Sequence, residues 1–190
     1  MTETPLQKTA ITLCGSLRHG SINETLRQHM SLKLRDAGVA VTDLSLADFE
    51  MPIFNQDIED AGNTPEAASR LADLFRTHDI VLIITPEYNG GVTPLIANTV
   101  SWLSRQKPSP WRHAIFGIGG VSDGKYATIF GLSHLRDTLS KIGALVVPTL
   151  LGLGPAPGVF DAEGNPNEAN IQWKVGQMVR ELTHFSRGGI

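Results

Sequence analysis

Residues 10–23 read AITLCGSLRHGSIN, an apolar run followed by a polar turn that contains two glycines. The apolar run, residues 10–14, predicts a short buried strand, and residues 24 to about 36 have the periodicity of a helix. A polar turn between a strand and a helix is a common seat for a phosphate. The first N–H groups of a helix lack partners, and the helix dipole adds partial positive charge there. We therefore expect a phosphate-binding turn at residues 15–23.

The side chains of this turn suit a phosphate. Ser16, Ser21 and Asn23 can each donate a hydrogen bond. Arg18 adds a fixed cation with a forked geometry. Hydrogen bonds to a charged group contribute roughly 1.5–3 kcal/mol each, so several together can hold a phosphomonoester without a metal. The alternative is an ordinary capped turn, because Ser21 and Glu24 have the S-x-x-E spacing of a capping box.

Outward from this turn, apolar runs alternate with helical patterns. Further strands are expected at residues 39–44, 80–84, 113–118 and 145–147. Further helices are expected at residues 65–75, with Thr64 as N-cap, and at residues 94–105, 132–142 and 171–185. The five consecutive aliphatic residues 80–84 belong at the centre of a parallel sheet. The order βαβαβαβαβα predicts one flavodoxin-like α/β domain over residues 1–190, a three-layer sandwich with a five-stranded parallel sheet of order 2-1-3-4-5.

Three predicted loops follow the first, third and fourth strands and meet at one edge of this sheet, where ligands bind in such folds. The third of these loops is expected at residues 119–124, and residues 47–64 and 150–167 are expected to be long loops. In the loop at residues 86–91, the glycines let backbone approach a flat ring, and Tyr88 supplies an aromatic wall. The alternative is that Tyr88 packs on a helix and Asn89-Gly90 is only a turn. A phosphate at the first loop and a ring at the others describe flavin mononucleotide, FMN.

Composition excludes several classes of protein. The 190 residues suit one domain, and the net charge of -3 offers no basic face for nucleic acid or anionic lipid. No apolar run approaches the ~20 residues of a membrane span, and the N-terminus lacks the apolar region of a signal peptide. The single cysteine, Cys14, is expected to be a buried thiol and fits a reducing cytoplasm.

Other motifs are absent or incomplete. No G-x-G-x-x-G follows the first strand, which argues against a Rossmann NAD domain. Residues 119–125 match a nucleotide-binding P-loop up to Lys125, but Tyr126 stands where Ser or Thr must hold magnesium, so Lys125 is expected to be a solvated lysine. The six histidines are scattered and no G-x-S-x-G is present, so neither a metal site nor a serine hydrolase is expected.

The motifs G-S-L-R-x-G-S-x-N, at residues 15–23, and T-P-E-Y-N-G, at residues 85–90, resemble the NADPH-dependent FMN reductase family of flavodoxin-like quinone, chromate and azo-dye reductases. The match extends to Asn98, to W-L-S-R at residues 102–105 and to H-L-R at residues 134–136. The resemblance implies bound FMN, hydride transfer to it from NAD(P)H, a small acceptor such as a quinone, chromate or azo compound, and a homodimer or homotetramer. By position it implies cofactor contacts from Ser16, Arg18, Ser21, Ile22, Asn23, Pro86, Glu87, Tyr88, Asn89, Gly90 and Ser122.

The chain departs from the family at two places. Ala97 and Ser101 stand where the family has a lysine and an acidic residue, which bears on subunit contacts. Residues 127–130 replace a G-G-x-R turn, which bears on where NADPH or the acceptor sits. Trp102 and Leu103 either meet a partner subunit or pack on their own sheet. A flavin-binding electron carrier, or a redox-responsive module without turnover, is the alternative function.

Overall fold

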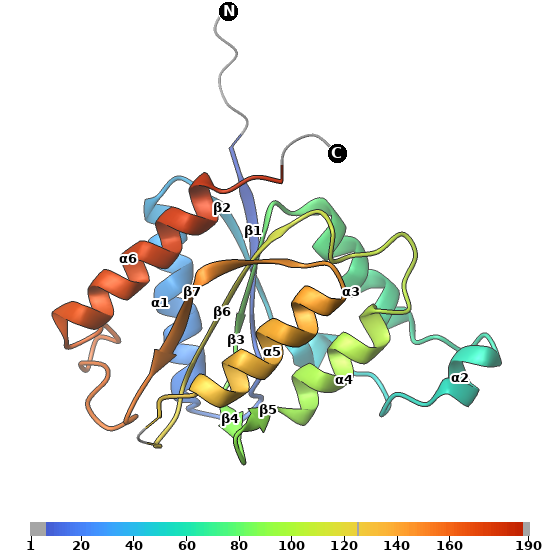
Figure 1. Cartoon of the computed structure of the whole chain (residues 1–190), viewed down its shortest axis with the longest axis horizontal. Helices are drawn as coiled ribbons and strands as arrows, with labels where there is room; N and C mark the ends of the chain where they lie inside the picture. Colours follow the sequence, from blue (N-terminus) through green and yellow to red (C-terminus); the bar gives the residue numbers. More distant parts are fainter. Residues whose placement is uncertain (1–6, 125, 188–190) are drawn as a thin grey trace, which may run out of the picture.

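The computed structural model describes residues 7–124 and 126–187, which form three layers (Figure 1). The central layer is a parallel sheet with the order β2-β1-β3-β6-β7. Its strands are β1 (Thr9–Cys14), β2 (Ala40–Leu44), β3 (Ile80–Ile84), β6 (Ile115–Val121) and β7 (Leu145–Leu153). This is the flavodoxin-like order 2-1-3-4-5, so the predicted fold and strand order are confirmed.

Helices cover both faces of the sheet (Figure 1). The helices on one face are α1 (Ile22–Asp36) and α6 (Ala169–His184). Those on the other face are α3 (Glu66–Thr77), α4 (Pro94–Leu103) and α5 (Ile129–Lys141). The central strand β3 supplies both cores, because side chains alternate along a strand: Val81 and Ile83 join one cluster, and Leu82 and Ile84 the other.

The stretch of residues 47–64 is more ordered than predicted. It contains most of the short 3-10 helix η1 (Leu46–Phe49) and the helix α2 (Gln56–Asp60). Trp102 donates its indole N–H to the carbonyl oxygen of Pro52, at 2.8 Å, and its ring lies edge-on to Phe54. Trp102 and Leu103 are both fully buried in the core of their own chain. The interpretation that they pack on their own sheet is therefore the correct one.

Two strands run further than the sequence indicated. Gly119 and Gly120 suggest a turn, yet both lie in β6, so the loop begins at Ser122. A Cβ atom on Gly120 would lie 1.9 Å from the carbonyl oxygen of Thr85. The glycines of β6 therefore let the backbone of neighbouring segments lie close to this strand. β7 passes Pro148 with a register shift against β6 and continues to Leu153. The predicted loop at residue 150 therefore starts four residues later than expected.

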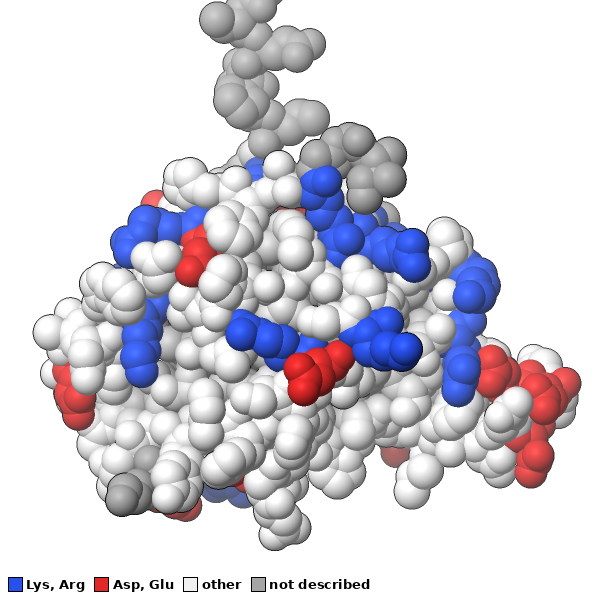
Figure 2. Space-filling model, in the orientation of Figure 1, with Lys and Arg blue, Asp and Glu red and all other residues white. Residues whose placement is uncertain are grey.

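Smaller differences concern the ends of helices. Pro65, and not Thr64, occupies the N-cap position of α3, which begins at Glu66. None of the helices in the described segments is long and apolar enough to cross a membrane. On the face shown in Figure 2, acidic side chains gather over α2 and basic and acidic groups are otherwise interspersed, with no continuous basic stripe on that face.

Candidate functional site

The turn after β1 is held closely against the end of β3. Gly15 donates its N–H to the carbonyl oxygen of Ile84 at 2.7 Å, and its carbonyl accepts from the Thr93 hydroxyl at 3.3 Å. A Cβ atom on Gly15 would lie 2.4 Å from the Thr85 hydroxyl oxygen, so only glycine fits there. The turn is thus fixed where β1 and β3 end together.

The start of α1 differs from a capping box. Ser21 is the N-cap residue, but its side chain caps no backbone N–H, so that interpretation was wrong. Glu24 instead binds the guanidinium of Arg27, with Nε 2.9 Å from Oε2. The Ser21 hydroxyl belongs to a residue that is 4% exposed, and it has no hydrogen-bond partner among the described residues. A hydroxyl that opens onto a cavity at a helix start, beside the free N–H groups of the first turn, suits a phosphate oxygen.

Asn23 ties this helix start to β6. Its side-chain Nδ2 donates to the carbonyl oxygen of Val121 at 3.0 Å, and the Val121 N–H donates to its Oδ1 at 2.8 Å. Both polar atoms of the side chain are therefore engaged within the chain. Asn23 positions the turn with its side chain and offers a ligand its backbone N–H.

The loop at residues 86–91 is a small hairpin. Its strands β4 (Glu87–Tyr88) and β5 (Gly91–Val92) are antiparallel, and Asn89 and Gly90 make the turn with φ of 52° and 73°. The Glu87 carboxylate accepts the N–H of Gly131 at 2.8 Å and so fixes the hairpin to the start of α5. Tyr88 is 50% exposed, so it is not packed away on a helix and remains available as a wall.

A cavity of about 410 Å³ lies between the turn, the hairpin and the end of β6. Nine of the residues predicted to contact FMN line it: Ser16, Arg18, Ser21, Ile22, Asn23, Pro86, Glu87, Tyr88 and Ser122. Asn89 and Gly90 do not line it, because they form the tip of the hairpin. The remaining lining comes from Val121, Asp123 and Ala156, which sequence reasoning missed. Val121 and Asp123 flank Ser122, whereas no motif marks Ala156.

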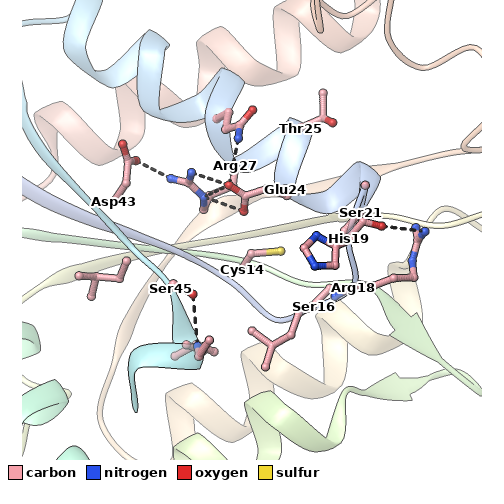
Figure 3. A pocket seen from close by; sticks show the side chains of 16 residues that line it. Cys14, Ser16, Arg18, His19, Ser21, Glu24, Thr25, Arg27, Asp43 and Ser45 are labelled. Atoms are coloured by element: carbon pink, nitrogen blue, oxygen red, sulfur yellow. Dashed lines mark hydrogen bonds and ion pairs between the residues drawn. The ribbon is translucent and has the colours of Figure 1, made fainter. Parts of the chain in front are cut away.

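A larger cavity of about 730 Å³ lies on the other side of the turn (Figure 3). Ser16, Arg18 and Ser21 line both cavities, so the turn is a shared wall. Cys14 lines the larger cavity and is 5% exposed. Burial raises the pKa of its thiol to about 11, so the thiol is protonated and not nucleophilic at neutral pH.

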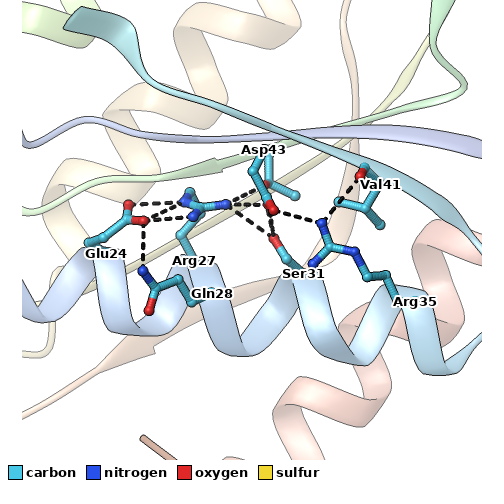
Figure 4. Close-up of polar contacts among 8 residues, drawn as sticks. Glu24, Arg27, Gln28, Ser31, Arg35, Val41 and Asp43 are labelled. Carbon is cyan, nitrogen blue, oxygen red and sulfur yellow. Dashed lines mark hydrogen bonds and ion pairs between the residues drawn. The ribbon is translucent and has the colours of Figure 1, made fainter.

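An ion network centred on the buried Arg27 borders the same cavity and joins α1 to β2 (Figure 4). The Arg27 guanidinium lies between the carboxylates of Glu24 and Asp43, and Arg35 reaches Asp43 at 2.6 Å. Burial acts to raise the pKa of Asp43, but hydrogen bonds from Arg35, Ser31 and other neighbours outweigh it and hold that pKa well below its usual range. The network fixes the helix whose start forms the turn.

The chemistry of the smaller cavity fits FMN. Hydroxyls, free N–H groups and the Arg18 cation gather at one end, and the hairpin offers backbone and the Tyr88 ring at the other. Within residues 7–124 and 126–187, no group of three or more His, Cys, Asp or Glu side chains could hold a metal ion. Lys125, predicted to be a solvated lysine, lies outside the described residues.

Fold and cavity together define a flavodoxin-like protein with a mononucleotide-sized site at the carboxyl edge of its sheet. Residues 9–157 match the family described as NADPH-dependent FMN reductase, and the chain belongs to that family. An NAD(P)H-dependent FMN reductase of Pseudomonas aeruginosa is 32% identical over 178 residues, covering 92% of this chain and 93% of that protein. A quinone reductase of Escherichia coli K12 is 31% identical over 180 residues, covering 92% of each.

A solved structure agrees with the fold. The flavoenzyme NAD(P)H:(acceptor) oxidoreductase of Paracoccus denitrificans superposes with a TM-score of 0.75 at 24% identity. The match covers 94% of this chain and 99% of that one. The three-layer arrangement is therefore that of a known flavoenzyme.

Proposed function

We propose that this chain is an FMN-dependent NAD(P)H oxidoreductase that passes reducing equivalents to a quinone, chromate, azo compound or similar small acceptor. Membership of the FMN reductase family supports this, as do relatives named as FMN and quinone reductases. The observation that carries the proposal is the Ser21 hydroxyl, which has no hydrogen-bond partner among the described residues and opens onto a cavity bounded on its far side by the Tyr88 hairpin.

The residues of the smaller cavity have separable tasks. Ser16, Arg18 and Ser21, with the backbone N–H groups of Ile22 and Asn23, would hold the phosphate. Pro86, Glu87 and Tyr88 would border the ring on one side, and Ser122 on another. When bound, FMN supplies the hydride-accepting ring, so the protein supplies binding and orientation. We assign no side-chain acid or base.

The same edge of the molecule supports a dimer or tetramer. Tyr126, Ile129 and Phe130 are exposed apolar side chains at the start of α5, and the rings of Tyr126 and Phe130 lie 5.6 Å apart. This helix start is bonded to the hairpin that carries Tyr88. Apolar side chains exposed beside a site are typical of a surface that a second subunit covers. The single cysteine supports a cytoplasmic location.

The visible spectrum of the purified protein tests the cofactor. We expect a yellow protein that releases FMN on denaturation and oxidises NADPH or NADH when 1,4-benzoquinone is added. FMN binding without quinone-dependent oxidation of either nucleotide would instead indicate an electron carrier or a redox-responsive module. A chain that takes up no FMN would contradict the proposal.

A further inference from the structure

A third cavity, of about 400 Å³, lies between α1 and α6, which run side by side in Figure 1. Its lining includes His29, Lys33, Pro166, Gln172, Val175 and Val179. None of its lining residues lines the cavity assigned to FMN. A ligand there would therefore be a second molecule and not part of the cofactor.

His29 has a largely buried side chain with no hydrogen-bond partner among the described residues. It is 7% exposed and lines this cavity, and its ring makes no hydrogen bond within the described part of the chain. Burial and then the nearby Lys33 ammonium lower the pKa of its imidazole, so the ring is neutral at neutral pH. It thus offers one N–H donor and one nitrogen acceptor. Its ring nitrogens are open to the cavity, so a bound molecule can hydrogen-bond to them.

Gly176 keeps the cavity open. It lies in the interior of the 16-residue helix α6, where glycine is destabilising relative to alanine. Among the described residues outside the helix's own backbone, a Cβ atom there would approach one atom within 4 Å, the flexible end of Arg180 at 3.5 Å, which is an ordinary contact. Its φ is not positive either, so neither crowding nor backbone geometry requires glycine. Its missing side chain is what leaves room between the helices.

The chemistry of the lining selects one kind of ligand. Lys33 brings an ammonium whose ion pair with Asp36 is long, at 3.5 Å, and exposed. The nearby Asp161 is occupied by its own turn, where it accepts the N–H of Asn165 at 2.7 Å. We propose that this cavity binds a small carboxylic acid with an apolar body. Its carboxylate would lie between Lys33 and His29, and its body against Val175 and Val179.

Titration of the full-length protein with benzoate tests this proposal, followed by the ring C–H resonances of its histidines in NMR. We expect the His29 resonance to shift saturably while the other five histidines stay unchanged. Benzamide, the neutral analogue, should bind about tenfold more weakly, because it loses a charge-assisted hydrogen bond. No shift of His29 with benzoate, or equal binding of benzamide, would overturn the proposal.

Variants of the lining separate this site from the fold and from FMN. Gly176→Leu fills the cavity with a strong helix former, and we expect it to abolish benzoate binding without lowering the melting temperature. Gly176→Ala should raise the melting temperature and weaken benzoate binding.

The lysine variants test the charge. Lys33→Met should weaken benzoate binding about tenfold, whereas Lys141→Met, which changes a matched exposed lysine on α5, should not. Unchanged benzoate affinity in both glycine variants would contradict the assignment. FMN content, read from flavin absorbance, should stay the same in all four and reports on the proposed function alone.

Discussion

Asn23 and Val121 are joined by two hydrogen bonds, of 3.0 and 2.8 Å, across 98 residues of sequence. One residue lies in the first turn of α1 and the other ends β6. The pair connects the turn at residues 15–21, which supplies the proposed phosphate contacts, to the loop that carries Ser122. The two sides of the smaller cavity are therefore held together by one amide side chain.

Removing this amide should damage both stability and binding. In Asn23→Ala the buried N–H and carbonyl groups of Val121 lose their partners, and we expect a loss of about 1–3 kcal/mol in the free energy of unfolding. Urea unfolding measures it. Thr183→Ala, which removes a side-chain bond on the more exposed surface of α6, serves as the control and should cost less. A stability of Asn23→Ala equal to that of the unmodified chain would show that the link is dispensable.

Arg18 is expected to act on the cofactor and not on the fold. Its side chain is exposed and makes one long bond, of 3.5 Å, to the carbonyl oxygen of His19. Arg18→Ala should therefore weaken FMN binding by ~1.5–3 kcal/mol, which is about ten- to a hundredfold in affinity. It should leave the melting temperature of the apoprotein unchanged. Fluorescence titration with FMN provides the measurement. Arg112→Ala, another exposed arginine, should leave FMN affinity unaltered.

Ser21 separates binding from stability in a different way. Its hydroxyl opens onto the cavity and has no partner among the described residues, so Ser21→Ala should leave the unfolding free energy of the apoprotein unchanged. The same change should weaken FMN binding by about 1.5–3 kcal/mol, which is the usual contribution of a hydrogen bond to a charged group. Calorimetric titration and thermal unfolding of one preparation test both halves. A variant that unfolds earlier yet binds FMN normally would assign the hydroxyl a structural role.

The lowered pKa of Asp43 leads us to expect that the stability of the fold decreases in acid. Burial acts to raise its pKa, but hydrogen bonds from Arg35, Ser31 and Thr12 lower it below the ordinary 3.8. Since the folded pKa lies below the unfolded one, its stabilising contribution is complete above about pH 4 and is lost as the pH falls further. Unfolding free energies measured from pH 7 to pH 3 should decline less steeply in Asp43→Asn than in the unmodified chain. Identical slopes would remove Asp43 from the acid response.

Much of the fold could be predicted from the alternation of apolar runs with helical patterns and from the motif of the first turn. The aliphatic run of β3 and the glycine turn after β1 were sufficient to predict the strand order and the edge at which the loops meet. Ala156 was missed because it reaches the cavity through tertiary folding, and no local pattern marks it. Gly119 and Gly120 resembled a turn because the sequence does not reveal the 1.9 Å approach to Thr85 that requires a residue without a side chain.

The role of Ser21 could not be decided from spacing alone. Its S-x-x-E pattern with Glu24 is that of a capping box. Glu24 instead forms an ion pair with Arg27, and the partner that holds Arg27 in place is Asp43 on β2. This partner is distant in sequence, so local reasoning could not weigh it. Similarly, Trp102 bonds to Pro52, which lies 50 residues earlier, and this contact cannot be predicted from the local sequence.

The turn residues Ser16, Arg18 and Ser21 form a partition between two chambers. These are the smaller cavity, of about 410 Å³, and the larger cavity, of about 730 Å³. Any attempt to re-engineer the larger chamber by mutating this partition should also disturb the proposed flavin site. Residues that face only the larger chamber, such as Thr25, Gln28 and Ala47, escape this coupling. Variants meant to change the larger chamber alone should therefore start from those positions.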